Sequence, residues 1–229
     1  MNQVLNENQQ LKLNNSALLW VDKLQTRLEK LETLPLKSLD PEDTALVIID
    51  MTNGFAREGL LASPRVAALI PAIVSLAEAC LSRRIPVIAP SDTHTPEAEE
   101  FMAYPAHCVA GSEESDLVDE LKSLNGIMKL EKNSTQIWHS QAFQDWFREN
   151  VQRSTWILTG DCTDICVLQF ALALKTFFQS ENRPSRVIVP INAVNTFETP
   201  DHPGDLYHLM ALALMEAGGV ELVKGVAVT

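Results

Sequence analysis

The stretch TWILTGDCTDICVLQFALAL, residues 155–174, changes from one hydrophobic pattern to another. Residues 155–159 form a short apolar run with β-branched side chains, which predicts a buried strand, whereas 164–179 has the spacing of a helix. Cys162 and Cys166 lie four positions apart at the junction. A strand that turns directly into a helix is half of a β–α–β unit, so this stretch favours an α/β fold.

The same alternation extends through the rest of the chain. Apolar runs that predict buried strands occupy 44–49, 85–90, 126–131, 155–159, 186–191 and 220–224. Helix-like segments lie between them at 64–82, 114–123, 140–152, 164–179 and 203–217. Strands that alternate with helices predict right-handed crossovers and a mostly parallel sheet covered on both faces. We therefore expect residues 44–229 to form a three-layer, doubly wound domain with a six-stranded sheet.

An N-terminal extension, residues 1–43, precedes this domain. Residues 1–15 are polar, rich in Asn and Gln and without periodicity, so we expect them to be frayed. Leucines recur at helical spacing in 16–33, which predicts an amphipathic helix with Ser16 as its N-cap, followed by a linker. This helix packs on the domain or on another subunit, and a non-catalytic interaction module built on it is one alternative function.

Composition limits the class of partner. The 229 residues carry a net charge of −12, which argues against nucleic acid and anionic membranes as partners. Four cysteines in a chain of this length are no disulfide framework, and the N-terminus lacks the pattern of a signal peptide. The most apolar window, 66–81, is interrupted by Pro71 and Glu78 and does not predict a membrane span. We expect a cytoplasmic protein with reduced thiols.

Reactive side chains follow four of the predicted strands. Asp50 follows the first strand, Asp92 and His94 follow the second, Lys132 follows the third, and Cys166 lies in the turn after the fourth. Ligands of open parallel sheets bind beyond the carboxyl ends of the strands, where these residues would meet. The sequence thus predicts one site that contains an acid, an amine, a thiol and imidazole.

Several roles are open for the two cysteines of the turn. A thiol in the first turn of a helix is stabilised as thiolate by the free N–H groups and the macrodipole, which favours Cys166 as a nucleophile. The alternatives are two buried thiols, a metal site and a redox pair. A zinc site needs further ligands that the chain does not offer at suitable spacing. A redox pair normally has two residues between its cysteines, whereas Cys162 and Cys166 have three.

A second candidate site lies in SDTHTPEAEEFMAYPAHCV, residues 91–109. Asp92 and His94 are two positions apart, and His107 follows later with acidic residues between. Carboxylate with two imidazoles suits Zn²⁺, Mn²⁺ or Fe²⁺, although a polar loop with capping histidines is the alternative. The remaining histidines have no comparable partners, and we interpret them as structural or surface residues: His139, His202 and His208.

These motifs resemble those of the isochorismatase-like cysteine hydrolases, and among them the nicotinamidases and pyrazinamidases. The resemblance covers residues 44–224 and includes VIIDMTNGF with Asp50, MKLEKNST with Lys132 and LTGDCTDICV with Cys166. It implies a catalytic triad of these three side chains. Lys129 is a competing lysine, but it lies within the predicted strand, whereas Lys132 follows it.

The resemblance also implies further site residues. By position in DTH and YPAH, the implied metal ligands are Asp92, His94 and His107, with Glu100 as a fourth. Phe55 and Tyr104 match positions that hold the pyridine ring. A cis peptide would join Asp161 to Cys162 and shape an oxyanion hole together with Cys166. The chain departs from the family at Thr52, where many members have Gln, at the polar residues of the turn, and in its extension.

The activity that follows from the resemblance is hydrolysis of nicotinamide, or of a close pyridine or pyrazine carboxamide, through a thioester. A divalent metal ion (Zn, Mn or Fe) would bind the pyridine nitrogen. The alternatives are another small amide, such as a ureido or carbamoyl compound, and hydrolysis of the isochorismate ether. The expected partners are a small-molecule amide and further copies of the chain, with neither nucleic acid nor membrane.

Overall fold

A computed structural model describes residues 6–228. Its centre is a six-stranded sheet with the order β4-β3-β2-β5-β6-β7, in which all neighbouring strands are parallel. The strands are β2 (Thr44–Ile49), β3 (Val87–Asp92), β4 (Ile127–Lys132), β5 (Thr155–Gly160), β6 (Arg186–Pro190) and β7 (Glu221–Val223). The expected doubly wound, six-stranded fold is confirmed.

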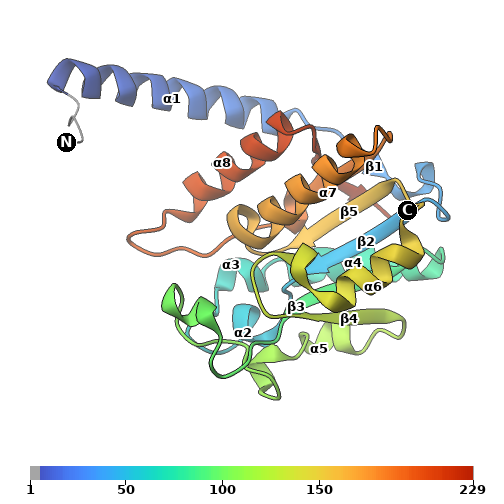
Figure 1. Cartoon of the computed structure of the whole chain (residues 1–229). Helices are drawn as coiled ribbons and strands as arrows, with labels where there is room; N and C mark the ends of the chain where they lie inside the picture. The colour runs from blue at the N-terminus through green and yellow to red at the C-terminus, as the bar shows by residue number, and fades with distance from the viewer. Residues whose placement is uncertain (1–5, 229) are drawn as a thin grey trace.

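Helices cover both faces of the sheet (Figure 1). They are α2 (Asn53–Ala56), α3 (Pro64–Ala67), α4 (Ile70–Ser82), α5 (Asp119–Lys122), α6 (Gln141–Asn150), α7 (Leu168–Ser180) and α8 (Gly204–Ala217). Successive side chains of a strand point to opposite faces. In β2, Val47 and Ile49 belong to the core under α6–α8, whereas Leu46 and Ile48 belong to the core under α3–α5. Burial on both faces explains why the strands read as continuous apolar runs.

Two predicted helices are shorter or more divided than their patterns indicated. The segment 64–82 forms α3 and α4 rather than one helix, and 114–123 contains only the short α5 after a 3₁₀ turn. Before α7, residues Thr163–Val167 form a π-helical turn instead of a regular first turn. Such π turns occur often at functional sites, and this one contains Cys166.

The N-terminal helix begins earlier than predicted. Helix α1 spans Glu7–Glu29, so the prediction that residues up to 15 are frayed is wrong for the described part, and Ser16 is no N-cap. The cap is Asn6, which forms a capping box with Gln9. Residues 1–5 lie outside the described residues. The hydrophobic pattern did not predict this half of α1 because its residues are polar on most sides of the helix and exposed. In Figure 1 the helix projects beyond the domain.

The end of α1 is attached to the domain. Leu24 and Leu28 are buried in the core beside α8, and Arg27 forms an ion pair with Glu216 of that helix. The segment predicted as a linker then contains β1 (Thr33–Pro35), which pairs in parallel with β8 (Gly225–Ala227) in a separate two-stranded sheet. The extension and the last strand of the chain therefore meet on one side of the domain.

One helical stretch, Pro64–Ser82, is apolar and long enough to cross a membrane by length and composition alone. It comprises α3 and α4, and its inward side chains lie in the core under the sheet, including Ile70, Ile73 and Leu76. Its hydrophobicity is therefore that of a helix that packs on a sheet.

Candidate active site

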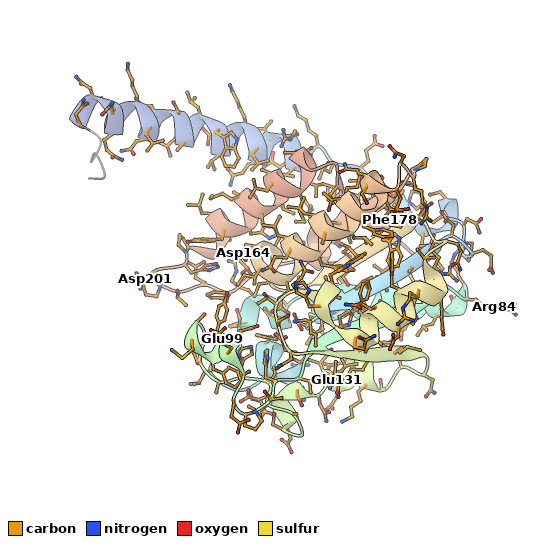
Figure 2. The ribbon with its side chains drawn as sticks, viewed as in Figure 1. Arg84, Glu99, Glu131, Asp164, Phe178 and Asp201 are labelled. Carbon is orange, nitrogen blue, oxygen red and sulfur yellow. The ribbon has the colours of Figure 1, made fainter. Side chains whose placement is uncertain are left out.

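The site lies where the chain reverses its direction of travel across the sheet. From β2 the chain adds β3 and β4 on one side, and β5 then returns to the other side of β2. The crevice beyond the carboxyl ends of β2 and β5 is the topological switch point, where such sheets bind ligands. Asp50 follows β2 directly, and the turn with Cys162 and Cys166 follows β5. Figure 2 shows the labelled Asp164 and Glu99 on this side of the molecule, away from Phe178 and Arg84.

Lys132, the last residue of β4, links the predicted triad. Its Nζ atom lies 2.9 Å from Asp50 Oδ2, 2.5 Å from Asp92 Oδ1 and 3.9 Å from Cys166 Sγ. Asp50 has a left-handed backbone, with φ of 54°, and its Oδ1 accepts a bond of 2.9 Å from the N–H of Asp92. The structure thus brings Asp50, Lys132 and Cys166 together. Lys129 instead points elsewhere, and its Nζ donates to Ser115 O.

The charges of this cluster are buried and depend on one another. The side chain of Lys132 is 0% exposed, and those of Asp50 and Asp92 are 1% exposed. Burial raises the pKa of Asp50 to about 6, against the opposing effect of Lys132. Burial also disfavours the charge on Asp92, but Lys132 and two imidazoles outweigh it and hold the pKa of Asp92 below its usual range. Unequal environments thus leave Asp50 as the more basic carboxylate.

The surroundings of Cys166 disfavour its thiolate form. Burial raises the pKa of Cys166 well above its ordinary value, against the opposing effect of Lys132. Burial and the neighbouring carboxylates thus oppose the thiolate that a helix terminus is expected to favour, so the thiol needs a base to lose its proton. One ligand atom each of Asp50, Asp92 and Cys166 lies within 4.8 Å of the others, so a base is at hand for the thiol proton.

The turn after β5 has the predicted cis peptide between Asp161 and Cys162. Gly160 precedes it with φ of 107°, and a Cβ atom there would lie 1.9 Å from Ile49 O, so only glycine fits beside β2. The N–H of Asp161 donates to Ile49 O at 3.0 Å, which removes it from the predicted oxyanion hole. The amides of Cys162 and Cys166 remain the candidates for that role.

Four side chains next to the triad form a cluster suited to a metal ion. Asp92, His94, Glu100 and His107 each offer a ligand atom within 4.8 Å of the others. Asp92 Oδ1 lies 3.4 Å from His94 Nε2, and Asp92 Oδ2 lies 3.7 Å from His107 Nε2. This carboxylate and imidazole donor set suits a divalent transition metal. All four predicted candidates meet, Glu100 included.

The orientation of both imidazoles fits a metal. His94 Nδ1 donates to Asn133 Oδ1 at 3.1 Å, and His107 Nδ1 donates to Pro105 O at 2.8 Å. Each Nε2 therefore faces the cluster as the ligand atom, and that of His94 is buried without a hydrogen-bond partner among residues 6–228. Asn133 was not predicted as a partner of His94, although it directly follows Lys132 in the MKLEKNST motif.

Both groups open into one pocket with mostly apolar walls. Asp50, Cys166, Asp92 and His107 line it together with Phe55, Leu61, Val66, Tyr104, Ile165 and Phe197. The rings of Phe55 and Tyr104, predicted to hold substrate, lie 5.3 and 6.4 Å from that of His107. Phe197 was not predicted, because nothing in the sequence around it marks a site.

Two histidines interpreted as structural or surface residues hold the π-helical turn. His208 Nδ1 lies 2.9 Å from Thr163 Oγ1, and His202 Nε2 lies 2.9 Å from Asp164 Oδ2. Both histidines come from the region of α8, far along the chain. The structural interpretation is thus confirmed for His208, whereas His202 lies beside the pocket wall.

His208 makes stability depend on pH. Burial, with the nearby Arg65, lowers the pKa of His208 to about 4. Between pH 6.5 and 4 the unfolded chain binds a proton at this residue that the folded chain does not, so acid favours unfolding. As the pH falls across this window, we expect the free energy of unfolding of the wild type to decrease by up to about 3 kcal/mol more than that of His208→Gln. Urea unfolding of both proteins at several pH values measures it, and parallel curves would contradict the assignment.

Several known proteins are similar to this chain in sequence or in structure. The isochorismatase domain family matches residues 44–220. Nicotinamidase 1 of Arabidopsis thaliana is 29% identical over 90% of this chain and 96% of its own. Among solved structures, nicotinamidase PncA of Bacillus subtilis is 26% identical with a TM-score of 0.66, over 79% of this chain and 99% of that chain. N-carbamoylsarcosine amidase of Thermoplasma acidophilum is 25% identical with a TM-score of 0.64, over 79% of this chain and 95% of that chain. The chain therefore belongs to the isochorismatase family and lies close to its nicotinamidases.

Proposed function

We propose that the protein hydrolyses nicotinamide, or a close pyridine or pyrazine carboxamide, to the acid and ammonia through a thioester on Cys166. The observation that carries this proposal is the shared pocket: a thiol with a buried base and a metal-type cluster open into the same aromatic-lined space. The similarity to two nicotinamidases supports the same substrate class.

The first half-reaction forms the thioester. Asp50 takes the proton of Cys166 as sulfur attacks the carboxamide carbon. The N–H groups of Cys162 and Cys166 stabilise the oxyanion of the tetrahedral intermediate. Asp50 then gives its proton to the leaving nitrogen, so ammonia departs and the acyl group stays on sulfur.

The second half-reaction restores the thiol. Asp50 takes a proton from water, whose oxygen attacks the thioester, and then returns that proton to the sulfur of Cys166. Lys132 holds its carboxylate partners in place and offsets their charge throughout. Its three contacts keep the base within reach of the sulfur in both half-reactions.

A divalent ion fits the cluster of Asp92, His94, Glu100 and His107 by donor type and by imidazole orientation. When bound, it would supply a Lewis-acid contact for a ring nitrogen of the substrate. The chain's part is to fix the ligands: Asn133 and Pro105 orient the imidazoles, and the N–H of Thr135 donates to Glu100 Oε2 at 3.0 Å.

Removal of the metal is expected to weaken turnover. Dialysis against a chelator should lower the rate of nicotinamide hydrolysis by at least about ten-fold, because the substrate would lose the contact between the ion and its ring nitrogen. His107→Ala should also lose bound metal, measured by elemental analysis of the purified protein. His139→Ala, an exposed histidine outside the cluster, is the control. Full activity of metal-free enzyme would refute the role.

A second candidate is an open-chain carbamoyl compound, which the similarity to N-carbamoylsarcosine amidase favours. Ammonia release from nicotinamide, pyrazinamide and N-carbamoylsarcosine, compared as kcat/KM, separates the two. Preference for the open-chain compound would replace the proposed function. We also place the enzyme in the cytoplasm, where its four unpaired cysteines would remain reduced.

A further inference from the structure

Phe197 occupies the mouth of the pocket. It lies on the loop between β6 and α8 and lines the pocket that also contains Asp50 and Cys166. With Tyr104 and Ile165 it also lines the groove outside. Its side chain is partly exposed and belongs to both the pocket and the groove. Figure 2 shows Asp201 of the same loop on the side of the molecule where Asp164 lies.

His202 holds Phe197 by ring stacking and by a hydrogen bond. The two rings are stacked, with centroids 3.9 Å apart and planes 13° apart, and His202 Nδ1 donates to Phe197 O at 3.1 Å. Tyr207 of α8 stacks on the other side of His202, also at 3.9 Å. The Nε2 atom of His202 bonds Asp164, two positions before Cys166. The orientation of Phe197 is thus tied to the turn that carries the thiol.

Arg65 of α3 holds the same loop through three hydrogen bonds. Its Nε donates to Thr196 O at 2.9 Å, and its Nη2 donates to Asn195 Oδ1 at 3.0 Å and to Asp205 Oδ1 at 2.7 Å. The carbonyl of Asn195 in turn accepts from the N–H of Thr163 at 2.9 Å. A loop held from two sides presents one side chain in a defined position, which is what specificity requires.

We propose that Phe197 is a specificity-determining residue that selects amides of flat rings, with His202 and Arg65 as its positioning residues. This inference rests on the proposed function and defines its substrate class. A planar ring in the pocket would contact Phe55 and Tyr104 near the metal cluster and Phe197 at the mouth. A puckered ring or an open chain offers no flat face to these aromatic side chains, so it gains less from them.

Two ring amides without a ring nitrogen test this independently of the metal. Benzamide is flat, whereas cyclohexanecarboxamide has a similar size but a puckered ring. Wild type is expected to bind benzamide about ten-fold more tightly, measured as inhibition constants against nicotinamide hydrolysis. Phe197→Leu keeps apolar bulk but removes the flat face, so the two constants should become similar. A Phe197→Leu protein that retains the wild-type preference would overturn the proposal.

A matched pair at His202 tests the positioning role. His202→Phe keeps a ring between Phe197 and Tyr207, so the preference for benzamide should survive. His202→Gln keeps a hydrogen-bond donor toward Asp164 but removes the stack, so the preference should be lost while kcat for nicotinamide changes less than KM. His139→Gln is the control for loss of an exposed histidine. Equal preferences in both His202 variants would refute positioning by stacking.

This outcome is separable from the fate of the proposed function. If the protein releases no ammonia from any ring amide, the proposed function fails. The same two amides, compared by calorimetric binding to wild type and Phe197→Leu, still decide whether Phe197 selects flat rings. If nicotinamide is hydrolysed but the Leu variant keeps the preference, only the present inference fails.

Discussion

Cys166→Ala is expected to lower ammonia release from nicotinamide by roughly 10⁴-fold or more, because the proposed acyl intermediate forms on this sulfur. The fold should survive, since alanine removes one sulfur atom from a site that is 5% exposed. Steady-state ammonia assays give the rate, and denaturant unfolding gives the free energy of the variant protein. Loss of activity without loss of the fold would assign the chemistry to this thiol.

Cys162→Ala is the matched control for that experiment. Cys162 is also buried, lies in the same turn and lines the same pocket, but only Cys166 contacts Lys132 and belongs to the cluster with Asp50 and Asp92. We expect this variant to keep its rate within about ten-fold, because alanine retains the N–H of the proposed oxyanion hole. The reverse result, an active Cys166→Ala and an inactive Cys162→Ala, would transfer the nucleophile to the other cysteine.

Lys132→Met should abolish activity and also destabilise the fold. The lysine is the partner of two buried carboxylates, and breaking a buried pair on one side costs about 3–5 kcal/mol because the remaining charges are uncompensated. Urea unfolding at pH 7 measures this loss. The difference in free energy of unfolding between wild type and Lys132→Met should decrease under acid conditions, where the unpaired carboxylates can take up protons.

Lys129→Met is the control, because it lies in the same strand and is only partly buried. Its Nζ donates to a backbone carbonyl, so we expect the free energy of unfolding to fall by about 1 kcal/mol and activity to stay near normal. Similar losses of stability and activity in Lys132→Met and Lys129→Met would show that the buried charge cluster is not the cause of these losses. They would also leave the choice between the two lysines of the motif open.

The sequence predicted those parts of the fold that depend on local pattern. The buried strands of a parallel sheet are continuous apolar runs, so all six were located within a few residues. Their carboxyl ends converge by topology, and Asp50, Lys132 and Cys166 therefore met as expected. The helix over 64–82 was predicted as one element because Pro71 and its neighbours do not mark the break at Ala68–Leu69.

What the sequence could not predict depends on contacts between distant segments. His202 and Phe197 acquire their roles because the loop before α8 folds back over the turn after β5. The pKa of Cys166 depends on burial and on carboxylates from two other strands, which lie far from it along the chain. The Asp161 amide is likewise occupied by β2, a neighbour that no local motif reveals.

Asp92 has a consequence for redesign of this enzyme. One of its oxygens faces Lys132 and the other faces His107, so a single side chain belongs to both the hydrolytic and the metal-type cluster. Under the proposed function, a substitution at Asp92 would therefore change both the donor set for a metal ion and the charge around Lys132. Redesign of one half of the site therefore has to include the other.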